Sequence, residues 1–135
     1  MLALALAAPA FAGGGVTIAQ PWMRFIIKAR PAAGYFSLRN AGDKPVTLTG
    51  ARSPACGMLM LHESKEENGV ASMRPVASVV VPAGGTLDFA PGGYHLMCMQ
   101  PLPALKVGAS VMVTLTFAGG QTLSAPFPVK GPGGK

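Results

Sequence analysis

SVMVTLTFAGGQTLSAPFPV, residues 110–129, is the stretch that decides the fold. Its first half places an apolar residue at every second position from Val111 to Phe117, with Met and Thr between them. Successive side chains of a strand point to opposite faces of a sheet, so this alternation predicts a half-buried strand. Gly119-Gly120 supplies a tight turn, and residues 121–129 are predicted to return as the second strand of a hairpin.

Short apolar runs of the same kind recur along the whole chain, separated by turn residues. We expect further strands at residues 16–19, 22–27, 35–39, 46–51, 58–62, 70–74, 76–81, 86–89 and 94–99. Residues 31–34 are expected to break the chain, 40–43 to form a turn and 63–68 to form a charged loop. With 18 Gly, 13 Pro and no helical periodicity in 135 residues, the pattern predicts one all-β domain, a Greek-key β-sandwich.

The two ends of the chain differ from the rest. Residues 1–12, MLALALAAPAFA, are apolar and end in a small-x-small triplet, as a signal peptide does before its cleavage site, although the usual basic start is missing. A buried first strand is the alternative, but Gly13-Gly14-Gly15 would break it. We expect a signal-peptide remnant at 1–12, the folded domain at 13–130 and a flexible tail at 131–135.

Export would place the chain in an oxidising compartment, where its two cysteines can pair. Cys56 and Cys98 are therefore expected to form a disulfide or to stay as buried thiols. The net charge of +6 comes from scattered Lys and Arg, with no dense basic run. Such a surface suits an acidic partner or a transient approach to a membrane surface, and it does not indicate nucleic-acid binding.

Both histidines of the chain lie in methionine-rich strands. In GGYHLMCM, residues 92–99, period two places His95, Met97 and Met99 on one face. Met58 and Met60 share a face with His62 in the same way, and Met73 follows on the strand expected to pair back. The residues with side chains that could bind a soft metal ion are Met58, Met60, His62, Met73, His95, Met97 and Met99.

Imidazole and thioether groups suit the soft ion Cu(I), and thioethers do not form disulfides in an oxidising compartment. Methionine is also an ordinary core residue, and a single His-x-Met is more often packing than ligand. Cys98 alternates away from His95 and Met97 and should face the core. A blue-copper electron-transfer site would need Cys98 to project from the same face of the strand as Met97, which requires a bulge. No nucleophile motif or zinc-type ligand set indicates an enzyme, and an incidental cluster on a structural sandwich stays open.

The spacing of His62, Met73, His95 and Met97 is H-x10-M-x21-H-x-M, which resembles the signature of the PCuAC family of periplasmic copper chaperones. AAGYFSLRNAGDKPV, MLMLHE and VPAGGTLDFAPGGYHLM are similar to the family as well, so the resemblance runs from about Trp22 to Phe127. It implies a cupredoxin-like β-sandwich or barrel with these four residues as Cu(I) ligands. The family motif does not require the cysteines.

The resemblance further implies a metallochaperone that delivers copper to the CuA site of cytochrome c oxidase subunit II. We therefore expect a periplasmic, monomeric Cu(I)-binding protein that is not an enzyme and that hands copper to subunit II or to another copper chaperone. Met99 is a candidate to contact the ligands from outside the site or to bind the ion during exchange, while Met58 and Met60 are expected in the core or at the rim. Copper storage or tolerance would use the same ligands, and an electron carrier is the remaining alternative.

Overall fold

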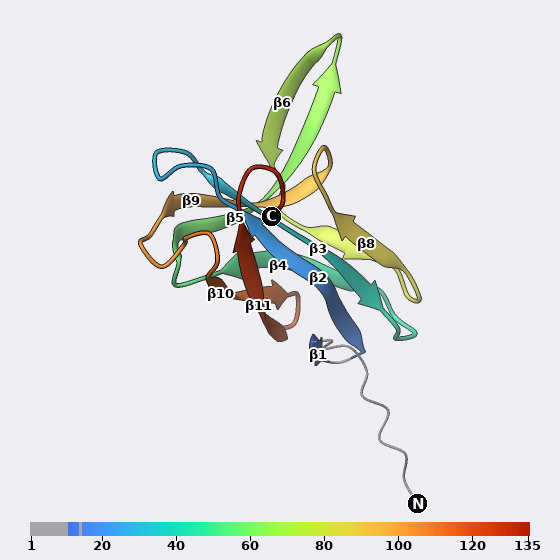
Figure 1. The fold of residues 1–135 in the computed structure, drawn as a ribbon. Coiled ribbons are helices and arrows are strands. Elements are labelled where there is room, and N and C mark those ends of the chain that lie inside the picture. Colours follow the sequence, from blue (N-terminus) through green and yellow to red (C-terminus); the bar gives the residue numbers. More distant parts are fainter. Residues whose placement is uncertain (1–10, 14) are drawn as a thin grey trace, which may run out of the picture.

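The computed structural model describes residues 11–13 and 15–135, and this part of the chain contains eleven strands and no helix (Figure 1). The strands are β1 (Phe11–Gly13), β2 (Val16–Arg24), β3 (Ala32–Asn40), β4 (Val46–Arg52), β5 (Cys56–Glu67), β6 (Val70–Pro75), β7 (Val79–Val81), β8 (Thr86–Phe89), β9 (Tyr94–Pro101), β10 (Ser110–Phe117) and β11 (Thr122–Lys130). The all-β prediction is confirmed. Within the described residues, no helix is long and apolar enough to cross a membrane.

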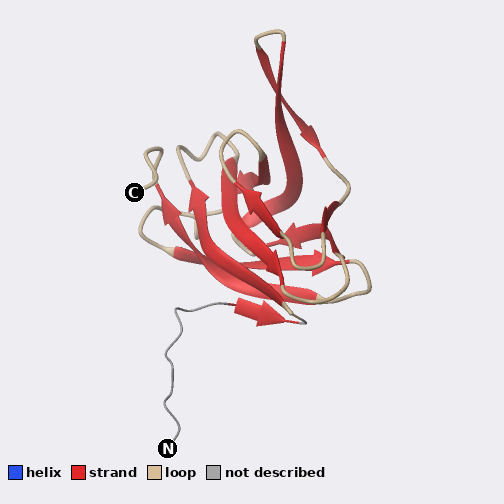
Figure 2. Cartoon of the chain, turned by 90° about the vertical axis from the view of Figure 1, so that its right-hand side faces the viewer, coloured by secondary structure: helices blue, strands red, loops and turns tan. Residues whose placement is uncertain are grey.

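The strands form one continuous, curled sheet whose ends do not meet. Its order is β6-β5-β9-β8-β3-β2-β11-β10-β4-β7, with β1 added beside β2 and a further pairing of β9 with β3. Most pairs are antiparallel, and β11–β2 and β8–β9 are parallel. Strands β4 and β5 contact each other without pairing, so the sheet folds over into two layers around one core (Figure 2). Strands distant in sequence thereby become neighbours, as β5 and β9 do.

The core confirms the alternation that decided the fold. Val111, Val113, Leu115 and Phe117 are buried, and β10 pairs with β11 across a turn in which Gly119 and Gly120 have φ of 93° and 89°. Positive φ values of this size favour glycine because it lacks a Cβ. The ring centroid of Phe36 lies 4.5 Å from that of Phe89 and 5.8 Å from that of Phe127. These contacts link β3, β8 and β11 within the core. Burial of each such aromatic or aliphatic side chain stabilises the folded state by about 1.5–3 kcal/mol.

Three local predictions were wrong. Residues 63–67 are not a loop: β5 runs on to Glu67, and the chain turns at Asn68 and Gly69, where φ is 52° and 78°. Glu and Lys are poor strand formers, yet here each residue pairs with β6, Lys65, Glu66 and Glu67 are exposed and Glu63 is partly exposed, so no charge is buried. The result is a two-stranded arm, the β5–β6 hairpin, that projects from the body (Figure 1).

The expected break at residues 31–34 was the second error, because β3 begins at Ala32 and pairs there with β9. The third was the division into strands at 16–19 and 22–27: the structure has one strand, β2, which continues through Pro21 and ends at Arg24. The pairing of β2 with β3 shifts register between Ala19 and Trp22, with Gln20 at φ 54°. A bulge leaves a residue unpaired, so the lack of an N–H in proline does not end the strand.

The expected signal-peptide remnant lies mostly outside the described residues. Of residues 1–12, the structure describes Phe11 and Ala12, which pair with Ile18 and Thr17. At the other end, residues 131–135 form a turn in which the Gly131 N–H donates to the Lys135 carbonyl at 2.8 Å.

Candidate metal centre

The two histidines lie directly opposite each other on neighbouring strands. His62 of β5 pairs with His95 of β9, and their ring centroids are 5.7 Å apart with an interplanar angle of 57°. Opposite residues of a ladder project from the same face of the sheet. The next pair, Leu61 and Leu96, is buried in the core. The imidazoles therefore lie on the other face, where His95 is still only 4% exposed.

Three of the four imidazole nitrogens lack protein partners in the described part of the chain. His62 Nδ1 and Nε2 and His95 Nε2 are buried and have no hydrogen-bond partner among the described residues. His95 Nδ1 lies 3.4 Å from the Gly93 carbonyl oxygen, a long contact that leaves Nε2 free to face the site. Burial lowers the pKa of His95, opposed in part by the Gly93 contact, and burial also lowers the pKa of His62. Both rings therefore favour the neutral form, which has a lone pair to offer a metal ion.

The thioethers predicted as ligands lie on the same face. Met97 is two residues after His95 on β9, and Met73 of β6 pairs with Ser64, which is two residues after His62. By the period-two rule, all four predicted ligands project to one side of the three adjacent strands β6, β5 and β9. Met73 is 60% exposed because the arm carries it out of the body.

A surface cavity of about 450 Å³ brings three of the four together, since Met73, His95 and Met97 all line it. His62 does not line this cavity and reaches the group through its ring contact with His95. The remaining wall is formed by Arg24, Ile26, Arg30, Pro31, Ala32, Ala33, Tyr35, Ser64, Pro91 and Gly92. The arm thus supplies one side of the cavity, and the 25–31 connection supplies another.

The donor set suits a soft ion. Among residues 11–13 and 15–135, no three His, Cys, Asp or Glu side chains form a group that could hold a metal ion. Two neutral imidazoles with two thioethers are donors that Cu(I) prefers, whereas Mg²⁺ and Ca²⁺ prefer oxygen. The orphaned imidazole nitrogens fit such an ion.

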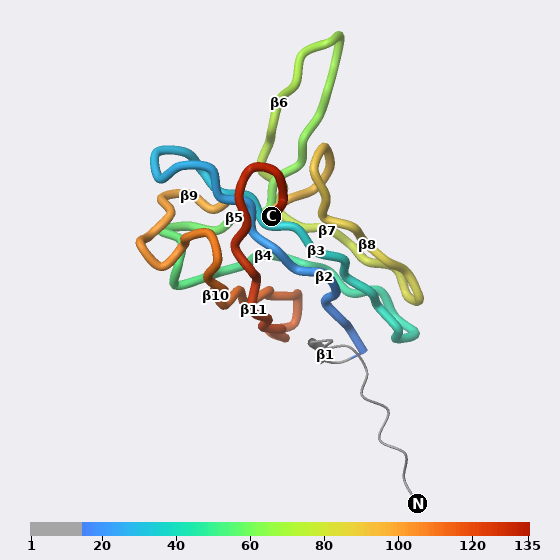
Figure 3. Tube along the Cα trace, viewed as in Figure 1, coloured from blue at the N-terminus to red at the C-terminus, as the bar shows by residue number. Residues whose placement is uncertain are grey.

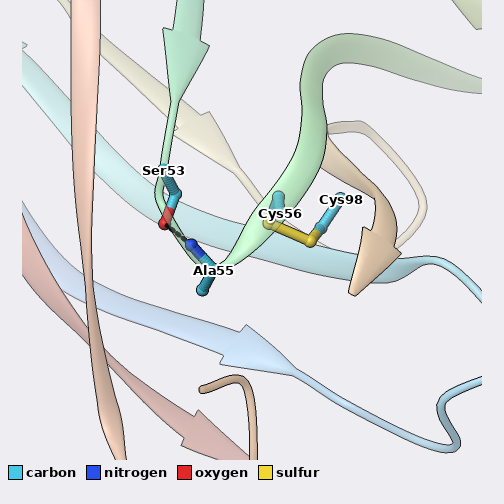
Figure 4. Close-up of a disulfide and its surroundings, with 4 residues drawn as sticks. All are labelled: Ser53, Ala55, Cys56 and Cys98. Atoms are coloured by element: carbon cyan, nitrogen blue, oxygen red, sulfur yellow. Dashed lines mark hydrogen bonds between the residues drawn. A yellow bond between two sulfur atoms is a disulfide. The ribbon is translucent and has the colours of Figure 1, made fainter. Parts of the chain in front are cut away.

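The cysteines are joined in a disulfide, which resolves the alternatives left by the sequence (Figure 4). Cys56 and Cys98 have Cα atoms 5.5 Å apart, and Cys98 is fully buried, as its position between Met97 and Met99 predicts. The Ala55 N–H donates to Ser53 Oγ at 3.2 Å in the turn that leads into Cys56. Neither cysteine is free. The disulfide ties β5 to β9 behind the strand pair that bears the histidines.

Sequence reasoning missed the basic and apolar wall of the cavity. Arg24 and Arg30 line it together with Ile26, which is 44% exposed (Figure 3 traces this 25–31 connection in blue). The Arg24 guanidinium lies 5.2 Å from the centre of the Tyr35 ring and 5.6 Å from that of Trp22. Burial raises the pKa of Tyr35, and Arg24 opposes that rise. No short motif marks these residues, because their approach to β9 depends on the pairing of β3 with β9.

An ion pair links the two strands at the base of the arm. Arg74 Nη2 donates to Glu63 Oε1 at 2.8 Å, and these residues are paired across β5 and β6 beside Met73. The Arg74 side chain lowers the pKa of the Glu63 carboxyl, first through this hydrogen bond. The pair is exposed, so its contribution to stability is small. Its position still favours the pairing that sets Met73 on the face of His62.

Fold and site together define a class: a cupredoxin-like β-sandwich that carries a surface cluster of two imidazoles and two thioethers. The LpqE-like family matches residues 16–129. Lxx21020 of Leifsonia xyli subsp. xyli (strain CTCB07), whose name describes it as a lipoprotein, is 36% identical over 117 residues, which cover 86% of this chain and 70% of that protein. The chain belongs to the LpqE-like family, which is the PCuAC family.

Solved structures agree with this assignment. The solution structure of CuI-DR1885 from Deinococcus radiodurans is 35% identical, with a TM-score of 0.64, over 93% of this chain and 81% of that one. The copper-bound PCuAC domain from PmoF2 has a TM-score of 0.77 at 22% identity, over 93% of this chain and all of that domain. The second likeness establishes the fold, and the first adds a relative solved with Cu(I).

Proposed function

We propose that this chain is an exported copper carrier that binds one Cu(I) through His62, Met73, His95 and Met97 and transfers it to a partner protein. The observation that supports this most is the opposed pair His62 and His95, which shares a face with the two thioethers. Both nitrogens of His62 and Nε2 of His95 are buried without a protein partner among the described residues. The relative DR1885, 35% identical, has been solved in a CuI form.

The ligand set suits transport because all four groups are neutral and none is a hard oxygen donor. A lowered histidine pKa keeps both imidazoles deprotonated, so few protons compete with the ion. Met73 is 60% exposed on the projecting arm, while His95 is 4% exposed. Met73 is therefore the ligand that an incoming donor would displace first. The ion would then be shared between carrier and recipient before the buried histidine releases it.

The surroundings of the site suit an acidic docking partner. Arg24, Arg30 and Arg74 lie around the cavity or beside Met73, and the exposed Ile26 adds an apolar contact. Complementary charge of this kind raises association rates and orients the partner. We propose the CuA domain of cytochrome c oxidase subunit II, or another copper chaperone, as the recipient. The disulfide and the lipoprotein name of Lxx21020 support export, and we propose the periplasm as the location.

Copper storage or tolerance would use the same four ligands and differs only in the absence of a recipient. A blue-copper electron carrier would require a thiolate ligand. Cys98 is the cysteine nearest to the site in sequence, and its sulfur is bonded to Cys56. The disulfide therefore disfavours the electron-carrier alternative.

The first experiment is an anaerobic Cu(I) competition titration against a chromophoric chelator. We expect one tightly bound equivalent, and a loss of affinity of about tenfold or more, equivalent to about 1.4 kcal/mol, in His62→Ala, Met73→Ala, His95→Ala and Met97→Ala. Met112→Ala is the matched control, because Met112 is 49% exposed on β10, outside the site. Unchanged affinity in the His95→Ala and Met97→Ala double variant would overturn the proposal.

A second experiment separates transfer from storage. Cu(I)-loaded protein is mixed with the apo CuA domain of a subunit II, and copper is measured in each protein after separation. Transfer that is slowed by raised salt and by Arg30→Ala would support a docking role for the basic wall. Copper that stays on the carrier while a small chelator removes it freely would favour storage.

A further inference from the structure

The ladder that pairs His62 with His95 continues as two methionine pairs. Met60 lies opposite Met97, and Met58 lies opposite Met99, in the same register and on the same face. Four thioethers thus follow the two imidazoles along β5 and β9. The proposed Cu(I) site uses one of the four, Met97, and leaves three unassigned.

Packing accounts poorly for Met58 and Met99 and only in part for Met60. Met58 is 57% exposed and Met99 is 37% exposed, and Met60 is half-buried. The pair between them, Leu59 and Cys98, is buried in the core at 7% and 0% exposure. The strand pair therefore buries its Leu and Cys and turns its methionines outward. Exposed methionine gains little of the hydrophobic stabilisation that usually explains the residue in a fold.

The spacing permits a shared ion. Opposite residues of an antiparallel pair have Cβ atoms about 4.5–5.5 Å apart, and diagonal neighbours about 7–8 Å, which long side chains can span. Met58 and Met99 are opposite, and Met60 is diagonal to Met99. Three flexible thioethers can therefore converge on one soft ion without moving the backbone.

The disulfide holds this arrangement in place. Cys98 lies between Met97 and Met99 in the sequence, Cys56 lies two residues before Met58, and their bond ties the two strands together behind the methionines. It also removes the two thiols that would otherwise compete for a soft ion, and the chain has no free cysteine.

We propose that Met58, Met60 and Met99 form a second binding site for Cu(I), weaker than the first because it has no imidazole and is more exposed. Met60 of this site lies opposite Met97 of the first. At about 3.4 Å per residue, Met58 is about 14 Å from His62 along β5. The second site is a point at which Cu(I) is loaded or released; this role, though not the binding, rests on the proposed function.

The test is an anaerobic Cu(I) titration of the full chain labelled with ¹³C at the methionine methyl groups, followed by NMR. We expect the first equivalent to shift Met73 and Met97, and the second to shift Met58, Met60 and Met99. Met112, which is 49% exposed on β10, is the internal control and should stay unchanged. In Met58→Leu with Met99→Leu, which keeps similar volume and apolarity, the second step should disappear and the first remain.

Two outcomes would overturn the second site: Met58 and Met99 unmoved after two equivalents, or Met112 shifted as strongly as they are, which would indicate adventitious binding. A repeat in His95→Ala separates the two proposals. There the Met58 and Met99 shifts should persist although tight binding is lost. If wild type and His95→Ala gave the same weak binding at Met58 and Met99 alone, the proposed carrier site would fail and the second site would stand.

Discussion

Removal of the Cys56–Cys98 disulfide should lower the free energy of unfolding by about 4 kcal/mol. The two cysteines are 42 residues apart in sequence. In the chain-entropy relation, closing a loop of this length removes about 13 cal/mol/K from the unfolded ensemble, which is about 4 kcal/mol at 25 °C. Small domains are stable by about 5–15 kcal/mol in total, so the loss is a large part of the stability.

The assay is equilibrium unfolding of the apo protein in guanidinium chloride, compared between the oxidised wild type, the reduced wild type and Cys56→Ala with Cys98→Ala. The reduced wild type keeps the volume of both sulfur atoms, whereas the double variant also leaves a small cavity beside the fully buried position 98. Both forms should be less stable than the oxidised protein, the variant by slightly more. A loss below about 1 kcal/mol in both would refute the reasoning, since packing alone would then hold β5 to β9.

Three further predictions follow from the strands around the site. The apo protein should become more stable as pH rises from about 5 to 7. The pKa values of His62 and His95 are lower in the folded state than the ordinary value of about 6.5. Below that value the unfolded chain therefore binds more protons than the folded chain, and stability is lost as pH falls. Unfolding curves across this range should show the slope, and His62→Gln with His95→Gln should flatten it. Leu96→Ala should lower the free energy of unfolding by about 2–5 kcal/mol, because Leu96 is fully buried behind His95. A decrease of less than about 1 kcal/mol, measured by denaturant unfolding, would contradict this. Met73→Leu should change stability by less than about 0.5 kcal/mol because Met73 is exposed, while Cu(I) competition should show weakened binding; equal affinity would remove Met73 from the ligand set.

The fold class could be predicted because its signal is local. The alternation from Val111 to Phe117 and the Gly119-Gly120 turn are properties of neighbouring residues, and the structure has them as β10, a tight turn and β11. Cys98 was placed in the core by the same rule. The failures were local as well: the charges of residues 63–67 indicated a loop, although a solvated two-stranded arm can bear charge on both faces.

The candidate site was only partly accessible from the sequence. Period two correctly placed His95 with Met97, and His62 with Met60, on shared faces of their own strands. It could not say that His62 lies opposite His95, because the register between strands 33 residues apart depends on packing and not on either strand alone. The spacing of the four residues supplied that link through the family resemblance. Which residues bind copper is still a prediction for this chain.

The sequence by itself determined most of the strands, their inward and outward faces and the supply of soft donors. Only the tertiary structure decided the pairing of β5 with β9, the disulfide between them and the cavity wall formed by Arg24 and Arg30. The physical reason is that strand alternation is set by each residue and its neighbours, whereas register and proximity are set by the burial of a core to which every strand contributes. The arm that carries Met73 shows both: the sequence supplies an exposed methionine, and the pairing of β6 with β5 places it on the face of His62 and beside the buried His95.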